Sequence, residues 1–499
     1  MKLFKKIAVF ILAFAMILAI AMPSVVMAED NYTITITPTT SDHTYEAYSI
    51  FEGKLSDSTL SDITWGNGIT EAGKTALLAD YGVADAAGLA KKLSEFATNS
   101  AEIKAFAKKA SKYLQHPTSA KAVGNTATIK VAKAGYYLIK DKDNSLGKNN
   151  DETYTEFILK VVKNQTIAPK SEKPTSEKKV KDTNDTTGVT TGWQDLADWD
   201  IGDKVPFQLK GTVAADYDKY TVYKMTFHDH ESKGLTLIKD SVEVYVDSNK
   251  VTDNTKYEVV TEHLGDNCTF EVRFANLKNI SDVKAGSVIT VEYKSELNKD
   301  AVIGSLGNPN EMYMEFSNNP NDDQGGETGK TPVDKVIVFT YKTIVNKVDP
   351  EGQPLQGAEF TLEKKVGDEW IEKAVVKNTE GTTFTFTGLD DGLYRLTETK
   401  TPSEYNTMNP NPLEFEITAT HEEIAGELKL TLKGNVTTGE VSFAEDLENG
   451  SLTANVVNHK GSDLPSTGGM GTTILYAAGT VMILAAAVFL VMQKKAEDK

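Results

Sequence analysis

Residues 341–349 read YKTIVNKVD, a short segment dominated by β-branched residues with an aromatic residue at its start. Such residues are enriched in strands, because their side chains pack well on a pleated surface. Segments of the same kind recur downstream at 382–389 (TTFTFTGL), 413–420 (LEFEITAT) and 451–460 (SLTANVVNHK). Turn signals separate them, so residues 343–460 are predicted to form an all-β unit.

The region before this unit, residues 178–342, shows the same pattern. It contains KVPFQLKG (204–211), YTVYKMTFHD (220–229) and VITVEYKSEL (288–297), and helical signals are nearly absent. Many short strands separated by turns are typical of a β-sandwich. The sequence therefore predicts two β-sandwich units in tandem.

Residues 29–163 differ from both. Strand patterns occur at 31–50, 127–141 and 154–163, but residues 70–114 are rich in Ala, Leu and Lys at helical spacing. This first domain is predicted to be mixed α+β. A connector with two prolines, predicted for residues 164–177, is expected to be extended.

Both ends of the chain carry export signals. Lys2, Lys5 and Lys6 precede an apolar run, and a small-residue site ends at Ala28, so residues 1–28 are predicted to be a secretory signal peptide and not a retained membrane helix. Residues 472–492 contain no charge and have about the length that spans a bilayer. Residues 461–499 also hold LPSTGG (464–469) before this span and a basic Lys pair, 494–495, after it.

Composition narrows the function classes. The chain has 53 Lys and Arg against 71 Asp and Glu, a net charge of −18, which argues against nucleic acid as a partner. Cys268 is the only cysteine, so an internal disulfide is impossible, and we interpret it as a small core residue. HDHE (228–231) could bind a metal, but a solvent-facing His pair is the preferred interpretation. Similarly, NDDQGGE (321–327) could bind calcium through its carboxylates, but a plain acidic loop is the preferred interpretation.

Three residues of the last unit could react with one another. Asn458 shares a strand face with Leu452, Ala454 and Val456, so its amide is expected to point into an apolar core. Lys347 lies in the first strand and Glu398 in GLYRLTETKTP. Burial favours a neutral amine and a neutral carboxylic acid, which together could form a Lys–Asn isopeptide bond with loss of ammonia. On the residue pattern alone, ordinary surface positions are the preferred interpretation and the reactive set is the alternative.

These motifs resemble the major (backbone) subunits of the sortase-assembled pili of Gram-positive bacteria. LPSTGG, the apolar span and the Lys pair resemble an LPxTG cell-wall sorting signal, with Leu464, Pro465, Ser466, Thr467 and Gly468 as its motif. NKVDPEGQPLQGAEFTL (346–362) and GLYRLTETKTPSEYN (392–406) resemble the B-type repeat of collagen adhesins. The resemblance implies a mainly β chain with tandem immunoglobulin-like, collagen-adhesin type sandwiches after the mixed α+β domain.

The middle unit and the first domain extend this resemblance over nearly the whole mature chain. WQDLADWDIGDKVPFQLKG (193–211) and YMEFSNNPN (313–321) resemble the isopeptide-forming pilin domain, and HTYEAYSIFEGKL (43–55) resembles the N-terminal domain. In the middle unit the resemblance implies a triad of Lys178, Asp229 and Asn318. Lys179 and Asn319 are the alternatives, and strand parity with Met314 and Phe316 favours Asn318.

The resemblance also implies a route of assembly. A sortase would cleave after Thr467, and Lys170 in TIAPK of another copy would accept the Thr, with Lys163 as the alternative acceptor. The chain is then a substrate and building block, not an enzyme, exported to the cell wall and needing no cofactor. Its expected partners are pilus and housekeeping sortases, head-to-tail copies of itself, minor pilins and host surface ligands. A singly anchored adhesin that does not polymerise is the alternative function.

Overall fold

The computed structural model describes residues 31–41, 43–98, 100–146, 152–169, 173–378, 380–424, 427–461 and 470–497. The predicted signal peptide, Lys170 and the sorting motif from Leu464 to Gly468 lie outside these residues. The chain divides into two compact units. Unit 1 comprises residues 1–174, 214–224 and 316–330, and unit 2 comprises 175–213, 225–315 and 331–499.

Unit 1 combines two sheets with three helices. One sheet has the order β5-β1-β8, and the other has the order β3-β2-β6-β7 with β4 beside β2. The strands are β1 (Tyr32–Ile36), β2 (Thr44–Ser56), β3 (Thr59–Trp65), β4 (Thr118–Lys121), β5 (Ala127–Val131), β6 (Gly135–Asp141), β7 (Glu156–Val161) and β8 (Gln165–Ile167). The short strand β22 (Thr328–Lys330) also falls in unit 1 but belongs to neither of these two sheets. The pairing of β8 with β1 shows that the first domain continues past the predicted boundary at residue 163.

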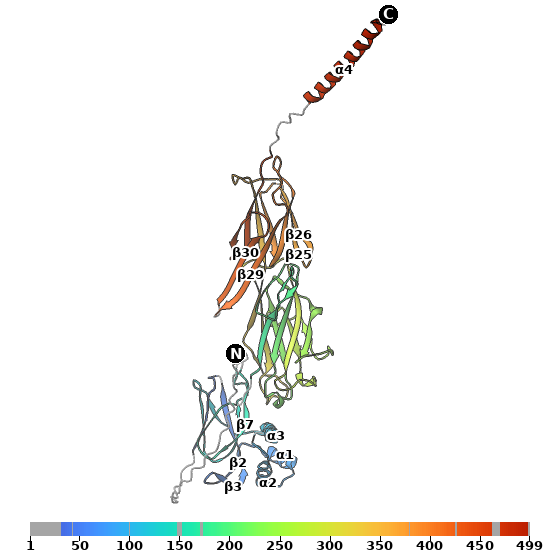
Figure 1. Ribbon diagram of the computed structural model, residues 1–499. Helices are drawn as coiled ribbons and strands as arrows, with labels where there is room; N and C mark the ends of the chain where they lie inside the picture. The colour runs from blue at the N-terminus through green and yellow to red at the C-terminus, as the bar shows by residue number, and fades with distance from the viewer. Residues whose placement is uncertain are drawn as a thin grey trace, which may run out of the picture. The chain divides into compact units, whose positions relative to one another are not determined.

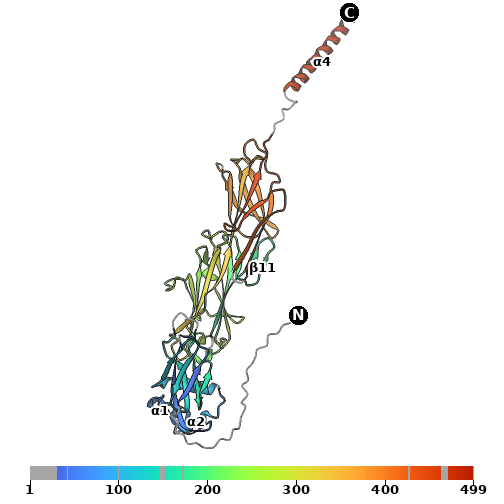
Figure 2. The same ribbon diagram turned by 90° about the vertical axis from the view of Figure 1, so that its left-hand side faces the viewer.

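The helices α1 (Glu71–Tyr81), α2 (Ala86–Leu93) and α3 (Ala101–Ala110) lie next to these strands in both views (Figures 1 and 2). Each begins after a residue whose side chain accepts a backbone N–H of the first turn, namely Thr70, Asp85 and Ser100. These caps satisfy donors that a helix start leaves unpaired. The helices bury Leu77, Leu89 and Phe106 against Ile50 and Leu138 of the sheet. The predicted mixed α+β domain is thus confirmed.

Unit 2 begins with a pair of sheets. One has the order β12-β23-β21-β14-β19-β18, and the other has the order β17-β16-β20-β13-β9, with β15 beside β20. The strands are β9 (Thr175–Val180), β10 (Thr183–Asn184), β11 (Val189–Thr190), β12 (Leu196–Asp198), β13 (Lys204–Thr212), β14 (Met225–Glu231), β15 (Leu235–Leu237), β16 (Glu243–Val246), β17 (Asn249–Lys250), β18 (Glu258–Val260), β19 (Phe270–Phe274), β20 (Val288–Leu297), β21 (Asn308–Ser317) and β23 (Asp334–Phe339). The strand β9 places the start of this domain at Thr175.

A second pair of sheets follows in unit 2, with the orders β27-β24-β32-β31 and β26-β25-β28-β29-β30. The strands are β24 (Tyr341–Val348), β25 (Glu359–Val366), β26 (Glu369–Lys377), β27 (Thr383–Leu389), β28 (Gly392–Lys400), β29 (Leu413–Ile424), β30 (Glu427–Val436), β31 (Phe443–Asp446) and β32 (Ser451–Val457). Val345 and Leu452 of the first sheet share a buried core with Phe360, Leu396 and Phe415 of the second. The fold is therefore mainly β, as predicted.

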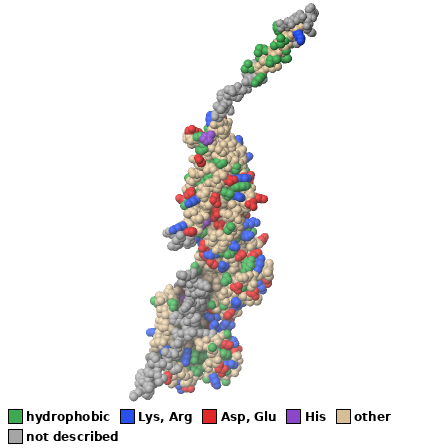
Figure 3. Space-filling model, in the orientation of Figure 1, with side chains coloured by type: hydrophobic (Ala, Val, Ile, Leu, Met, Phe, Trp, Pro, Cys, Tyr) green, Lys and Arg blue, Asp and Glu red, His purple; other side chains and the backbone are tan. Residues whose placement is uncertain are grey.

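The described chain ends with helix α4 (Met470–Glu497). Apolar side chains line this helix in the space-filling view (Figure 3). The predicted membrane span at 472–492 falls on α4. No helix among the described residues has both the length and the apolar character required to cross a membrane.

Candidate functional site

The second sandwich of unit 2 brings Lys347, Glu398 and Asn458 together, as the sequence predicts. Lys347 lies in β24, and Asn458 directly follows β32, the parallel neighbour of β24. Glu398 lies in β28 of the other sheet. The three residues are 0%, 4% and 1% exposed, respectively, so their polar groups meet inside the sandwich.

Hydrogen bonds fix the arrangement of this first triad. The Asn458 amide donates to Oε1 of Glu398 at 2.8 Å, and Oε2 of Glu398 accepts the backbone N–H of Met408 at 2.7 Å. Nζ of Lys347 lies 3.8 Å from Oε1 of Glu398 and donates to the Val456 carbonyl at 2.9 Å. The carbonyl oxygen of the Asn458 side chain has no hydrogen-bond partner among the described residues. It is therefore free to be polarised.

This geometry suits attack by an amine on an amide. Burial lowers the pKa of Lys347 to about 8, against the opposing effect of Glu398, so the neutral amine is far more populated near neutral pH than in an ordinary lysine. A neutral amine is the nucleophilic form of lysine. Because Glu398 contacts both the Lys and the Asn, it can move a proton between the amine and the leaving ammonia.

The first sandwich of unit 2 holds a second cluster around Lys178, which lies in β9 and is 0% exposed. Nζ of Lys178 contacts the carboxylate of Asp229 on β14 and donates to the hydroxyl of Tyr293 on β20 at 2.9 Å. That hydroxyl donates to Asp229 at 2.8 Å. Burial lowers the pKa of Lys178 and raises the pKa of Asp229. Both shifts favour the neutral pair that amide formation needs.

The asparagine at this cluster is Asn310, and the prediction of Asn318 is corrected accordingly. The Asn310 amide donates to the Tyr293 hydroxyl at 2.9 Å, and its side-chain oxygen is buried without a hydrogen-bond partner among the described residues. Asn318 belongs to unit 1, where its amide donates to the backbone carbonyl of Glu152 at 3.2 Å. Residues 310 and 318 lie eight positions apart on one chain segment, so the parity argument fits both equally well.

The other predicted alternatives find different partners. Lys179 is partly exposed and pairs with Asp195 at 2.5 Å, which leaves Lys178 as the buried amine. Asn319, in unit 1, donates to Glu327 at 3.1 Å. Sequence reasoning also missed Tyr293, whose hydroxyl links the lysine, the aspartate and Asn310. The alternating pattern of VITVEYKSEL places Tyr293 on the same strand face as the buried Val291. This alternation could have identified Tyr293 as an inward-facing residue.

The segment that carries the predicted acceptor borders a cavity in unit 1. Ala168 and Pro169 line this cavity of about 290 Å³ together with His43, Glu152 and Lys173. Lys170, the next residue along the chain, lies outside the described residues. Lys163, the alternative acceptor, is exposed and follows the end of β7.

His43 at this cavity is 2% exposed and lies between two carboxylates. Its Nδ1 is 2.7 Å from Asp141, and its Nε2 is 3.4 Å from Glu152, which also pairs with Lys173 at 2.8 Å. Burial alone would lower the pKa of His43, but the hydrogen bonds and charges of the two carboxylates raise it to about 9. The imidazolium therefore links His43 to Asp141 and Glu152, and through Glu152 to Lys173.

The His pair of HDHE does not face solvent as predicted. His230 is exposed, whereas His228 is 7% exposed and lies among Asp266, Glu271 and Glu315. Cys268 is partly exposed and is therefore not the core residue that the sequence predicts. In the acidic loop, Asp323 pairs with Lys112 at 2.6 Å within unit 1.

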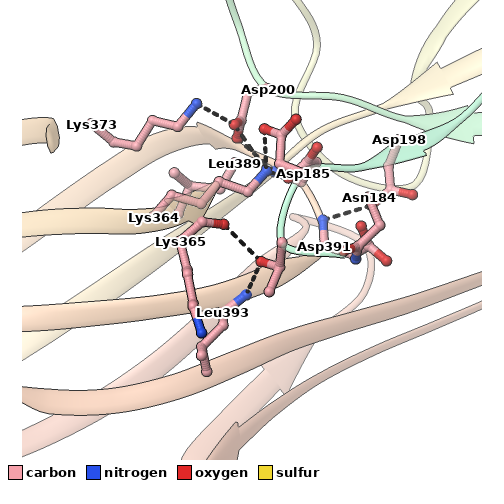
Figure 4. A network of polar contacts seen from close by, with 12 residues as sticks. Asn184, Asp185, Asp198, Asp200, Lys364, Lys365, Lys373, Leu389, Asp391 and Leu393 are labelled. Atoms are coloured by element: carbon pink, nitrogen blue, oxygen red, sulfur yellow. Dashed lines mark hydrogen bonds and ion pairs between the residues drawn. The ribbon is translucent and has the colours of Figure 1, made fainter. Parts of the chain in front are cut away.

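A buried ion cluster around Lys364 also lies in unit 2 (Figure 4). Nζ of Lys364 lies 3.0 Å from Asp185 and 3.0 Å from Asp200, and it contacts Asp390. Lys373 pairs with Asp200 at 2.5 Å. Burial lowers the pKa of Lys364, but the three carboxylates outweigh it and raise the pKa above the ordinary value. The cluster ties residues 185–200 to the strands of the second sandwich.

Three parts of the chain match known protein families. Residues 201–320 match the family described as Gram-positive pilin backbone subunit 2, Cna-B-like domain. Residues 342–431 match the SpaA prealbumin-like fold domain, and residues 456–499 match the LPXTG cell wall anchor motif. These matches fall on the two sandwiches and on the predicted sorting signal.

Individual relatives agree with these matches. The chain is 26% identical over 405 residues to the trypsin-resistant surface T6 protein of Streptococcus pyogenes serotype M6, across 66% of this chain and 71% of the relative. The T6 backbone pilin structure from that serotype has a TM-score of 0.55 at 18% identity and covers 87% of this chain and 99% of its own. The full-length major pilin SpaD of Corynebacterium diphtheriae has a TM-score of 0.50 at 17% identity, with coverages of 87% and 98%. These two structures support the fold.

Proposed function

We propose that a sortase links copies of this chain and that intramolecular isopeptide bonds strengthen each copy. The chain itself is a major (backbone) pilin of the Gram-positive type, a structural subunit of a cell-wall-anchored surface pilus and not an enzyme. The observation that carries the second part is the meeting of Lys347, Glu398 and Asn458 inside one sandwich. The first part rests on LPSTGG and on the match to the anchor motif.

In the proposed assembly step, the sortase cleaves the peptide bond between Thr467 and Gly468 and holds the Thr carbonyl as a thioester. The amine of Lys170 in another copy attacks this thioester, so an amide bond forms and the sortase thiol leaves. Pro169 favours this role, because it keeps the preceding backbone extended and fixes the chain next to the cavity edge. Pilus and housekeeping sortases, further copies, minor pilins and host ligands are the proposed partners.

In the proposed bond of the second sandwich, neutral Lys347 attacks the side-chain carbonyl carbon of Asn458. Glu398 takes up the proton that the attacking amine loses and delivers it to the Asn458 nitrogen, which leaves as ammonia. One C–N bond forms and one breaks, and Glu398 is regenerated. The parallel pairing of β24 with β32 means that the bond joins neighbouring strands. Tension along the chain would then pass through a covalent link.

In the first sandwich we propose the same reaction between Lys178 and Asn310, with Asp229 as the proton carrier. Lys178 and Tyr293 come from one sheet, while Asp229 and Asn310 come from the other. This bond would therefore cross the sandwich. The Tyr293 hydroxyl oxygen accepts a 2.9 Å hydrogen bond from the Lys178 amine and another of 2.9 Å from the Asn310 amide, so it keeps the two reacting groups close together.

Immunoblots of cell-wall extracts test the assembly step. A strain that expresses the wild-type chain should give a ladder of high-mass bands after boiling in detergent, and Lys170→Ala should give a single band. Lys163→Ala is the matched control and should keep the ladder. A ladder that survives Lys170→Ala and disappears with Lys163→Ala would assign the acceptor to Lys163. A single band from the wild type would favour the singly anchored adhesin.

A further inference from the structure

His228, Asp266 and Cys268 form a cluster in unit 2 that the pilus function does not use. His228 lies on β14, while Asp266 and Cys268 lie in the loop between β18 and β19. One possible ligand atom of each residue lies within 4.8 Å of the other two. The set offers an imidazole nitrogen, a carboxylate oxygen and a thiol sulfur, which together are typical of a zinc site.

The separations fit a small ion after a slight opening. Nδ1 of His228 is 2.7 Å from Oδ2 of Asp266 and 3.4 Å from Oε1 of Glu271. Ligand atoms around a tetrahedral zinc ion lie about 3.3–3.8 Å apart, as follows from metal–ligand distances of about 2.0–2.3 Å. The His–Asp pair therefore has to open by roughly half an ångström. Oε1 of Glu271 is already at the required separation from Nδ1, while its Oε2 contacts Arg273.

The ring nitrogens of His228 give independent support for a bound ion, because neither has a hydrogen-bond partner among the described residues. This side chain is more than nine-tenths buried, yet neither ring nitrogen makes a hydrogen bond with the described residues, and the 2.7 Å contact with Asp266 lacks hydrogen-bond geometry. The ring is held by stacking on Tyr313, with the centroids 4.4 Å apart. Buried polar groups normally have partners. A metal ion bound to Nδ1 would supply one.

We propose that His228, Asp266 and Cys268 bind one Zn²⁺ ion, with Glu271 or a water molecule as the fourth ligand. Coordination requires the thiolate, so the Cys268 proton is released to solvent on binding. Asp266 is 25% exposed at its side chain, so an ion can enter from solvent.

The ligand set selects zinc over calcium. Calcium takes six to eight oxygen ligands, whereas nitrogen and sulfur ligands favour zinc. The other acidic cluster, formed by Asp185, Asp200, Asp203 and Asp390, differs because the ammonium group of Lys364 already occupies it. That cluster includes a buried lysine, while the three members of the His228 cluster include no Lys or Arg.

Zinc titration of the mature chain, residues 29–467, tests the proposal. We expect one Zn²⁺ per chain by calorimetry and metal analysis, and at least about tenfold weaker binding in Cys268→Ser and His228→Gln. His230→Gln is the matched control: His230 has the same residue type two positions away but is exposed and contacts the Asn267 carbonyl at 2.8 Å. Its affinity should equal that of the wild type. Cobalt bound in place of zinc should show a thiolate charge-transfer absorption that Cys268→Ser lacks.

A second measurement needs no variant. Zn²⁺ should protect Cys268 of the wild type from alkylation, and a chelator should restore the reaction. An absence of both binding and protection, or zinc affinity unchanged in the two ligand variants, would overturn the proposal. Because the site shares no residue with Lys178, Asp229 and Asn310, loss of zinc binding should leave the intramolecular bonds intact. Failure of one proposal can therefore be told from failure of the other.

Discussion

The side-chain amide of Asn458 donates a 2.8 Å hydrogen bond to the carboxylate of Glu398, 60 positions earlier in the chain. The two residues belong to opposite sheets of one sandwich, and the amine of Lys347 lies 3.8 Å from the same carboxylate oxygen. This contact places the proton carrier between the nucleophile and the leaving nitrogen. The predictions on bond formation follow from it.

Replacing Glu398 by Ala should prevent the Lys347–Asn458 bond without removing either reacting group. The bond closes a loop of more than a hundred residues, so its loss should cost the second sandwich roughly 4–5 kcal/mol, by analogy with a disulfide. Limited trypsin digestion should then cut the second sandwich of the variant and spare that of the wild type. Glu404→Ala, an exposed control in the same region, should stay resistant. Equal resistance of Glu398→Ala and wild type would show that Glu398 is not needed.

Replacing Asn310 by Ala should abolish the bond of the first sandwich, because its side chain is the amide next to Lys178 and Tyr293. Asn318→Ala is the matched control, since this amide donates to Glu152 instead. Peptide mapping should find a Lys178–Asn310 cross-linked peptide in the wild type and in Asn318→Ala, but not in Asn310→Ala. A cross-link that involves Asn318 would restore the assignment made from the sequence.

Replacing Lys364 by Met should lower the melting temperature of unit 2. The change removes the ammonium group that contacts Asp185, Asp200 and Asp390. Removing one partner of a buried ion pair lowers the free energy of unfolding by about 3–5 kcal/mol. The loss should be smaller at pH 5 than at pH 8, since burial raises the pKa of nearby Asp203 to about 6 and the pKa of Asp390 as well. Protonated carboxyls need no counter-ion.

The matched control for this change is Lys365→Met, because Lys365 is the adjacent lysine and is partly exposed. Its melting temperature should stay near that of the wild type. If both variants melt alike at pH 8, the ion cluster does not stabilise unit 2.

The stability of unit 1 should fall as the pH rises above neutrality. The pKa of His43 in the fold is about 9, above its ordinary value of about 6.5. A raised pKa means that the stabilising effect is complete below pH 6.5 and is lost as the pH rises through 9. The loss should be about 3 kcal/mol. Thermal unfolding at pH 6 and pH 9 should therefore differ for the wild type.

His43→Gln supplies the control for this pH dependence, because glutamine keeps a polar group near Asp141 and Glu152 without a titrating charge. Its melting temperature should change much less between the two pH values. An equal decrease in the wild type and the variant would assign the pH dependence to other groups.

Much of this account could be predicted from local sequence. Alternating strand segments gave the tandem sandwiches, and helical spacing at 70–114 gave the helices of the first domain. Asn458 could be predicted to point inward because it continues the apolar face of Leu452, Ala454 and Val456. The match of the sandwich domains to pilin families agrees with these predictions.

The errors arose where parity alone could not decide. Asn310 and Asn318 share one strand parity, and only the position of Tyr293 on the facing sheet separates them. His228 and His230 also share parity, but His228 is buried next to Asp266, whereas His230 stays exposed although it contacts the Asn267 carbonyl of the same loop. Long-range packing of a loop on a sheet leaves no periodic signal in the sequence.

The intact mass of the mature chain tests the central claim most directly. Each intramolecular bond releases one ammonia, so the wild type should weigh about 34 Da less than its sequence mass, about 17 Da for each of two bonds. Glu398→Ala and Asn310→Ala should each show a deficit of only about 17 Da relative to their own sequence masses. A wild-type mass equal to the sequence mass would contradict the proposal that isopeptide bonds join Lys178 to Asn310 and Lys347 to Asn458.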